Sequence, residues 1–243
     1  VATDKANAFR GIPAVSDWQR ARSAAYFHYT SNETIHGVEF PDVPEIGDVP
    51  LVADFSSNFL SRPVDVSRFG MMYAGAQKNL GPAGITIAVI RKDLLGRHGR
   101  DLPPIFEWQN QVKNDSMFNT PPTFPWYVVG LVLKWMIAEG GLPVFAARNA
   151  EKSALLYSAI DASGGFYRNE VAISARSTMN VPFMLKDEVL DKAFLKESEA
   201  AGLLGLKGHR ALGGMRASIY NAMPLQGVQS LVDFMNDFAV RNG

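Results

Sequence analysis

The stretch Tyr73-Ala-Gly-Ala-Gln-Lys-Asn-Leu-Gly-Pro-Ala-Gly84 decides the fold of this 243-residue chain, with Lys78 near its middle. Apolar runs flank it at residues 70–75 and 85–90, and their composition predicts two buried strands. Fewer residues separate these strands than the roughly dozen that a helical crossover needs, so we expect them to run antiparallel in a mixed sheet. A lysine in such a turn is held on a rigid frame and stays accessible. This suits an amine that forms a Schiff base, because burial favours its neutral, nucleophilic form. An ordinary solvated loop lysine is the alternative interpretation.

The composition limits the class of protein. With 47% hydrophobic residues, the chain can bury one large core or two smaller ones. Lysine plus arginine and aspartate plus glutamate number 24 each, so no net charge attracts nucleic acid or a membrane. The absence of cysteine excludes disulfides and thiolate metal sites and favours a reducing, cytoplasmic location. No apolar run approaches the ~20 residues of a membrane span. We therefore expect no metal, no nucleic acid and no membrane among the partners.

The rest of the chain alternates between strand-like and helix-like segments. Short strands are predicted at 26–30 and 51–55, and long helices at 124–140 and 143–162. Gly164-Gly165 marks the clearest domain boundary. Beyond it come, in order, a strand at 180–185, a helix at 187–201, a strand at 214–220 and a helix at 224–241. This alternation predicts a small α/β domain with helices on one sheet face.

Asp54 ends the strand-like run Leu51-Val-Ala-Asp-Phe55. A carboxylate at a buried strand end is costly unless a cation or donor meets it. A protonated pyridinium nitrogen is one such partner, and keeping that proton in place makes the ring an electron sink. The alternative is an aspartate that caps a turn with Ser56 and Ser57.

Four blocks then carry a resemblance. They are Asp54-Phe-Ser-Ser57, Gly75-Ala-Gln-Lys-Asn-Leu-Gly-Pro-Ala-Gly84, Asp115-Ser-Met-Phe-Asn-Thr-Pro-Pro-Thr123 and Lys207-Gly-His-Arg-Ala-Leu-Gly-Gly-Met-Arg-Ala-Ser-Ile-Tyr-Asn-Ala-Met-Pro224. In matching order and over nearly the whole chain, they resemble the phosphoserine aminotransferase family. That resemblance implies a homodimeric, fold-type I transaminase dependent on pyridoxal 5'-phosphate. The family exchanges an amino group between glutamate and 3-phosphohydroxypyruvate in serine biosynthesis. It also acts on a phosphorylated hydroxythreonine in vitamin B6 synthesis.

The resemblance also implies a domain division. Residues 1–140 would be the remainder of a large cofactor-binding domain with a mixed, mostly parallel sheet, incomplete in this chain. Residues 141–243 would be a linking helix and a small C-terminal α/β domain. The family's N-terminal portion, with a Gly-rich turn for the cofactor phosphate, is not found in residues 1–40. We therefore expect the chain to be the C-terminal part of a longer enzyme, and expect cofactor binding by this chain alone to be weak.

The resemblance assigns roles residue by residue. Lys78 would be the Schiff-base lysine and Asp54 the partner of the pyridine nitrogen. The other cofactor contacts would be Thr34 at the phenolic oxygen, Ser56 and Gln77 at the phosphate, and Asn119 and Thr120 at the phosphate bound in the other subunit. The substrate contacts would be His209 and Arg210 at its phosphate and Arg216 at its α-carboxylate.

The arginine roles also make chemical sense by themselves. A planar guanidinium matches carboxylate or phosphate oxygens with two parallel hydrogen bonds. The alternative makes Arg216 a structural ion-pair former and His209 a surface residue. His28 and His36 are interpreted as structural. The Trp126/Trp135 face is interpreted as helix core.

Two other functions stay open from the sequence. One is a non-catalytic remnant that keeps the dimerising fold without competent cofactor binding. The other is a different fold-type I enzyme, such as a desulfurase or a glyoxylate transaminase. It is disfavoured because His209, Arg210 and Arg216 suit a substrate with two anionic groups.

Overall fold

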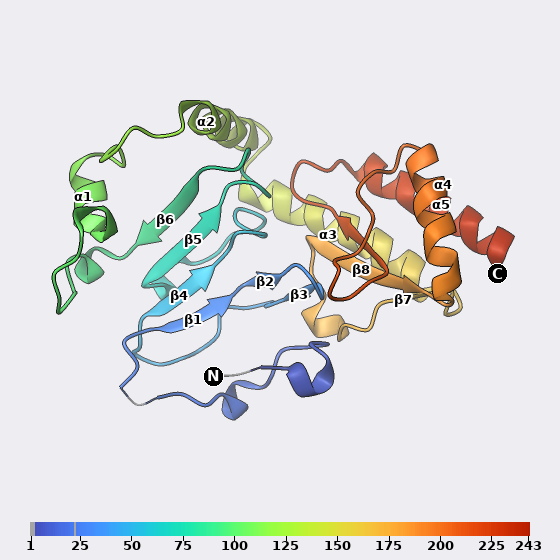
Figure 1. Ribbon diagram of the computed structural model, residues 1–243, viewed down its shortest axis with the longest axis horizontal. Helices are drawn as coiled ribbons and strands as arrows, with labels where there is room; N and C mark the ends of the chain where they lie inside the picture. The colour runs from blue at the N-terminus through green and yellow to red at the C-terminus, as the bar shows by residue number, and fades with distance from the viewer. Residues whose placement is uncertain (1–2, 22) are drawn as a thin grey trace.

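The chain folds around two larger sheets and a third sheet of only two short strands, as the computed structural model shows for residues 3–21 and 23–243 (Figure 1). Residues 1, 2 and 22 lie outside this description. The first sheet has the strand order β1-β4-β5-β6, formed by β1 (Phe27–Thr30), β4 (Leu51–Asp54), β5 (Met71–Gly75) and β6 (Thr86–Ile90). The first three strands are parallel and β6 runs antiparallel to β5. The predicted mixed, mostly parallel sheet is therefore confirmed.

Buried and partly exposed side chains alternate along β4 and β5, and this pattern shows which face of the sheet packs against the apolar core. Leu51 and Ala53 of β4 and Met72 and Ala74 of β5 are buried in one apolar cluster. Their neighbours point to the other face, because successive side chains of a strand alternate. β6 differs from the expected buried strand, since its residues are exposed or half-buried.

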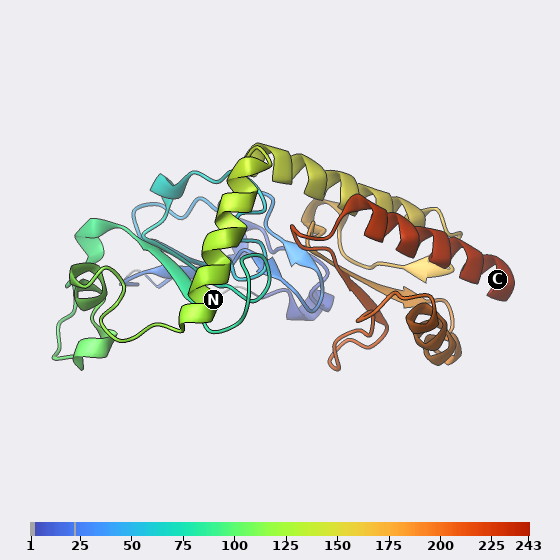
Figure 2. The same cartoon turned by 90° about the horizontal axis from the view of Figure 1, so that it is seen from above.

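The second sheet is antiparallel and carries the C-terminal half of the chain. It consists of β7 (Tyr167–Arg168), β8 (Asn180–Leu185) and β9 (Met215–Ser218). Its helices are α3 (Leu142–Asp161), α4 (Asp191–Ala200) and α5 (Leu225–Asn242). Figure 2 shows α3 and α5 lying side by side along this sheet. The predicted helix at 187–201 starts later than expected because a 3-10 turn, Glu188–Leu190, precedes α4.

The Gly164-Gly165 pair is not a domain boundary, which corrects the expectation from the sequence. Leu156 and Ile160 of α3 share one core cluster with Phe166 and Tyr167, which follow the glycines. Both glycines have positive φ and form the turn between α3 and β7. The division into 1–140 and 141–243 stays a prediction, and it fits the positions of the two cores.

Four short strands and helices were not expected from the sequence. They are the antiparallel strands β2 (Asn32–Glu33) and β3 (Val38–Glu39), the strand β7, and α1 (Trp108–Lys113) in the Pro-rich passage. Each is too short to show a periodic pattern. The β2–β3 turn lies against β8, where a Cβ on Gly37 would come within 2.7 Å of the Asn180 carbonyl oxygen. A glycine is needed there to let the two segments approach.

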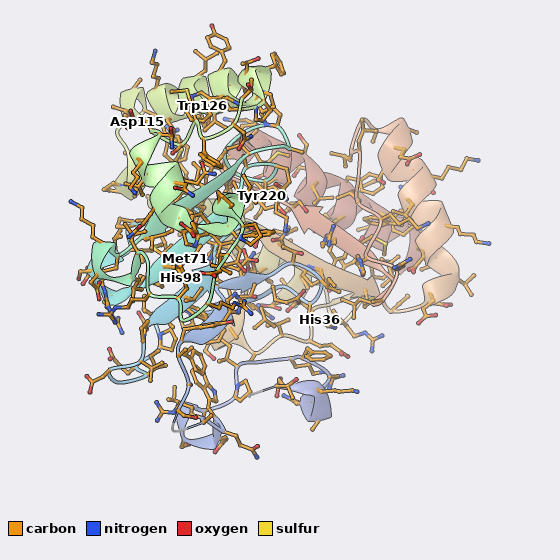
Figure 3. All side chains as sticks on the ribbon, turned by 60° about the vertical axis from the view of Figure 1, so that its left-hand side comes forward. His36, Met71, His98, Asp115, Trp126 and Tyr220 are labelled. Carbon is orange, nitrogen blue, oxygen red and sulfur yellow. The ribbon has the colours of Figure 1, made fainter. Side chains whose placement is uncertain are left out.

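Helix α2 (Thr123–Ala138) does not bury its tryptophans, contrary to expectation. Trp126 is 44% exposed and Trp135 36% exposed, and Trp126 lies on the outer part of the molecule in Figure 3. Among its residues only Val129 and Met136 are buried. No single helix in the described ranges is long and apolar enough to cross a membrane, and α2 passes that test only jointly with α3, at a bend of 88°.

Candidate functional site

Asp54 ends β4 at the carboxyl end of the parallel strands. It pairs in register with Thr30 of β1 on one side and with Tyr73 of β5 on the other. Its Oδ1 accepts a hydrogen bond of 2.8 Å from the Ser56 backbone N–H. The turn-capping alternative is thus realised, and the carboxylate is also half-buried near Lys78. Ligands of open α/β sheets bind at this end of the strands.

Lys78 lies in the turn between β5 and β6, which is closed by a hydrogen bond from Ala76 N–H to the Ile85 carbonyl. Its side chain is half-buried. Burial lowers the pKa of Lys78; Asp54 and Glu33 oppose this shift, and the positive charge of Arg216 adds to it. The turn therefore holds an amine that gives up its proton more readily than a solvated lysine.

Ser56 and Gln77 meet at the backbone of Gly75. The Ser56 Oγ accepts a hydrogen bond of 3.0 Å from the Gly75 N–H, which leaves its own hydroxyl proton available to an oxygen anion. The Gln77 side chain folds back over Gly75, so that a Cβ there would lie 2.6 Å from Gln77 Oε1. The two side chains predicted at the cofactor phosphate thus lie together beside Lys78.

Arg216 reaches this site from the other sheet. It lies on β9, and its Nη1 donates a hydrogen bond of 3.1 Å to the Thr34 carbonyl oxygen. Thr34 follows β2, in the half of the chain that carries Lys78. The structure therefore brings Asp54, Lys78, Thr34 and Arg216 together from segments up to 182 residues apart.

His209 and Arg210 lie in the turn of the loop that precedes β9. The His209 Nδ1 accepts a hydrogen bond of 3.2 Å from the Ala211 N–H, and Arg210 is exposed. The Gly208 N–H donates to the Gly214 carbonyl oxygen at 2.8 Å and closes the loop at its base. This loop therefore presents two cationic or donor side chains next to β9, the strand that carries Arg216.

Asn119 and Thr120 are not brought into this site within the described chain. Both are exposed on the segment before α2, and the Asn119 Nδ2 donates only to the Thr120 carbonyl oxygen, at 3.3 Å. Their predicted contact lies in a second subunit, so their role stays a prediction.

Three residues beside the site, Tyr73, His28 and Glu33, were not predicted from the sequence to take part in it. Burial, and then the charge and hydrogen bonding of Asp54, raise the pKa of Tyr73. The Tyr73 hydroxyl lies 2.9 Å from His28 Nε2. The negative charge of Glu33 acts to raise the pKa of Lys78. Only strand register could have found Tyr73, because it places this residue opposite Asp54. In the described ranges, no group of three or more His, Cys, Asp or Glu side chains could hold a metal ion.

Comparison with known proteins identifies the class. The family model "Aminotransferase class-V" matches residues 11–231, so the chain belongs to this class of fold-type I transferases. Two curated relatives, both named phosphoserine aminotransferase, come from Stenotrophomonas maltophilia (strain K279a) and Xanthomonas axonopodis pv. citri (strain 306). The first is 61% identical over 242 residues and the second 57% over 244. Each alignment covers the whole of this chain, and 67% and 68% of the relative respectively. Within its class, the chain thus belongs to the phosphoserine aminotransferase family.

Solved structures agree with this assignment. The chain is similar to phosphoserine aminotransferase from Bacillus circulans subsp. alkalophilus, with 48% identity and a TM-score of 0.95 over 98% of this chain and 66% of that one. It is also similar to a pyridoxal-phosphate-bound phosphoserine aminotransferase from Trichomonas vaginalis, at 42% identity and a TM-score of 0.88 over 93% of this chain and 64% of that one. The chain therefore spans about two thirds of the length of these proteins. An alanine–glyoxylate aminotransferase from Nostoc sp. shares the fold, at 16% identity.

Proposed function

We propose that the protein transfers an amino group between L-glutamate and 3-phosphohydroxypyruvate to give phosphoserine, with pyridoxal 5'-phosphate as cofactor. The observation that carries this proposal is the convergence of Lys78, Asp54 and Arg216 from two different sheets. Names of relatives at 57–61% identity support the same reaction. Serine biosynthesis is the corresponding pathway, and a phosphorylated hydroxythreonine of vitamin B6 biosynthesis is a second substrate, which carries the same carboxylate and phosphate groups.

The residues present fit this cofactor. Bound pyridoxal phosphate supplies a reactive carbonyl and an electron-withdrawing ring, which let an amino acid lose its α-proton. The Asp54 carboxylate is placed to hold a proton on a ring nitrogen, and Ser56 and Gln77 offer donors to a phosphate. Lys78 would take the proton from the substrate Cα and return it, and its lowered pKa makes it a better base than a solvated ammonium group would be at the same pH. Thr34 stands beside them and is held through its carbonyl by Arg216.

The substrate contacts follow from charge. The Arg216 guanidinium suits the α-carboxylate that both amino donor and acceptor carry. His209 and Arg210 suit the second anionic group, the phosphate of the acceptor. A glyoxylate transaminase needs no such second site, and the likeness to one at 16% identity shows the fold alone. The non-catalytic alternative is not favoured, since the lysine, the aspartate and the arginine are all present in one place.

A homodimer is part of the proposal. Along α2, the exposed or partly exposed apolar side chains of Phe124, Tyr127, Leu131 and Trp135 recur at helical spacing and so form one apolar face. Asn119 and Thr120 border this apolar face. A second copy seated on it would bury the apolar side chains and bring these two residues toward its partner's cofactor phosphate. A cytoplasmic location stays a prediction.

The reaction is tested with the purified protein, pyridoxal phosphate, glutamate and 3-phosphohydroxypyruvate, with phosphoserine measured by mass spectrometry. We expect phosphoserine to form, turnover to fall by orders of magnitude with unphosphorylated hydroxypyruvate, and Lys78→Ala to abolish both. A colourless protein that takes up no added cofactor would instead support the non-catalytic alternative. Equal turnover of the two acceptors would support a different transaminase.

A further inference from the structure

Helix α3 carries two buried polar side chains, Asn149 and Lys152, on one face. Each is only 2% exposed. The Lys152 Nζ donates to the backbone carbonyl oxygens of Ile219 at 3.0 Å and Tyr220 at 2.8 Å. No acidic side chain of the described chain forms an ion pair with it. A buried amine satisfied only by carbonyls is an unusual core residue, because an apolar side chain of similar length would avoid the cost of removing it from water.

The segment that Lys152 holds directly follows β9. Asn221, which ends it, is bonded on three sides. Its backbone N–H donates to Asn79 Oδ1 at 3.0 Å, its Nδ2 donates to the Leu60 carbonyl at 3.0 Å, and its Oδ1 accepts from Asn149 Nδ2 at 2.8 Å. Asn79 is the neighbour of Lys78, and Arg216 lies three residues before Ile219. Figure 3 shows Tyr220 between the parts of the molecule that carry the two sheets.

These bonds form one continuous connection between the two halves of the site. On one side is the turn that presents Lys78, fixed through Asn79. On the other is the strand that presents Arg216, fixed through the carbonyls at its end. Lys152 and Asn149 of α3 connect the two sides through their hydrogen bonds to residues 219–221. The Asn149 Nδ2 also donates to the Ser61 carbonyl oxygen at 3.1 Å. A buried polar network of this kind fixes geometry more strictly than apolar packing, because each hydrogen bond restricts direction as well as distance.

We propose that Lys152 is a positioning residue, which clamps residues 219–221 and thereby sets the place of Arg216 relative to Lys78. The inference rests on the proposed function, in which Arg216 binds the substrate carboxylate and Lys78 moves the proton. Lys152 itself touches neither substrate nor cofactor. Burial, with a smaller contribution from the positive charge of Arg148, lowers the pKa of Lys152 to about 8.

The first test asks whether Lys152 holds the segment, and it does not depend on catalysis. Lys152→Met and Lys152→Gln are compared with the unmodified protein by amide hydrogen exchange, and Lys192→Met on the exposed face of α4 is the matched control. We expect exchange of the peptide 215–223 to rise about tenfold or more in Lys152→Met, less in Lys152→Gln, and not in the control. The Gln variant keeps a donor, so it stays informative if the Met variant folds poorly. Unchanged exchange in both variants would overturn the proposal, whether or not the protein is a transaminase.

The second test asks whether Lys152 acts through Arg216. KM and kcat for glutamate are measured for Lys152→Met, Arg216→Lys and the double variant. We expect Lys152→Met to raise KM for glutamate about tenfold with a smaller change in kcat, and to add little in the Arg216→Lys background, because residues that act as one unit are not additive. If the KM increase of the double variant equals the product of the increases in the two single variants, Lys152 acts independently of Arg216. That result would assign Lys152 a merely structural role and overturn the inference. Absence of any turnover in the unmodified protein would instead refute the proposed function, while the exchange result still decides the clamp.

Discussion

Lys78 is an amine surrounded by charges of both signs. Burial and Arg216 favour its neutral form, whereas Asp54 and Glu33 favour the ammonium. Burial outweighs the two carboxylates, so the pKa of Lys78 is lowered overall. A transaminase lysine needs such a balance, because it must act both as nucleophile and as proton carrier.

This balance predicts a chemical reactivity. In the protein freed of cofactor, Lys78 should be acylated at a lower pH than the exposed Lys192, because a lowered pKa gives more neutral amine at any given pH. Asp54→Asn should lower its apparent pKa further, and Arg216→Met should raise it. Mass spectrometry of peptides labelled over a pH series gives both apparent pKa values. An identical pH dependence for the two lysines would contradict the assignment of a buried, reactive amine.

Lys152 predicts a pH dependence of stability. Its pKa is about 8 in the folded protein and near 10.5 when unfolded, so between these values the unfolded state binds more protons. The free energy of unfolding should therefore rise with pH from about 8 upward, by roughly 3 kcal/mol at most over the whole interval. Urea unfolding between pH 7.5 and 9.5 measures this slope. Lys152→Met should lose the rise, and a rise that persists in that variant would assign it to other groups.

At the scale of elements, the loop between Leu206 and β9 is shaped by glycine. A Cβ on Gly208 would overlap the carbonyl oxygen of Gly213, at the point where the two arms of the loop cross. The loop presents His209 and Arg210, and it shares β9 with Arg216. Backbone geometry therefore fixes the spacing between the proposed phosphate and carboxylate contacts.

Gly208→Ala should distort this loop, because its Cβ meets backbone rather than a flexible side chain. We expect a loss of about 1–3 kcal/mol in the free energy of unfolding, measured in urea. KM for 3-phosphohydroxypyruvate should rise more than KM for glutamate, since the loop binds the phosphate. Gly99→Ala is the control, because nothing lies within 4 Å of a Cβ there and its φ is not positive. Equal rises in the two KM values would place the phosphate contact elsewhere.

For the molecule as a whole, the exposed apolar face at α2 is a departure from an ordinary protein surface. Phe124 is 69% exposed and Tyr127 65% exposed. Exposed apolar surface of this kind is typical of interaction sites, and the partner that we propose for it is a second copy of this chain. It lies beside Asn119 and Thr120, whose proposed roles require a second subunit.

Tyr127→Glu should therefore dissociate the proposed homodimer, because a carboxylate would be buried without a partner at the proposed interface. Sedimentation velocity of the purified protein should show the monomer, and affinity for pyridoxal phosphate should fall with dissociation. Val189→Glu is the control, since Val189 is 81% exposed in the turn before α4, away from this face. A monomeric unmodified protein, or a Tyr127→Glu dimer, would refute the proposed interface.

The sequence by itself determined the local parts of this protein. Strand-like runs around Lys78, the long helices and the antiparallel pairing of β5 and β6 followed from pattern and spacing. Residue blocks in matching order identified the family, because chemistry-bearing residues stand in short contiguous motifs. The Trp126 and Trp135 interpretation failed, because a helix pattern marks an apolar face and does not say what covers it.

Only the tertiary structure decided which distant segments meet. Arg216 contacts the carbonyl of Thr34 across 182 residues, and Tyr73 lies opposite Asp54 through strand register. The burial of Lys152 against the carbonyls of residues 219 and 220 has no sequence signature, since its partners are backbone atoms. Sequence patterns report the periodicity of one segment, whereas the electrostatics of a site depend on how separate segments pack together.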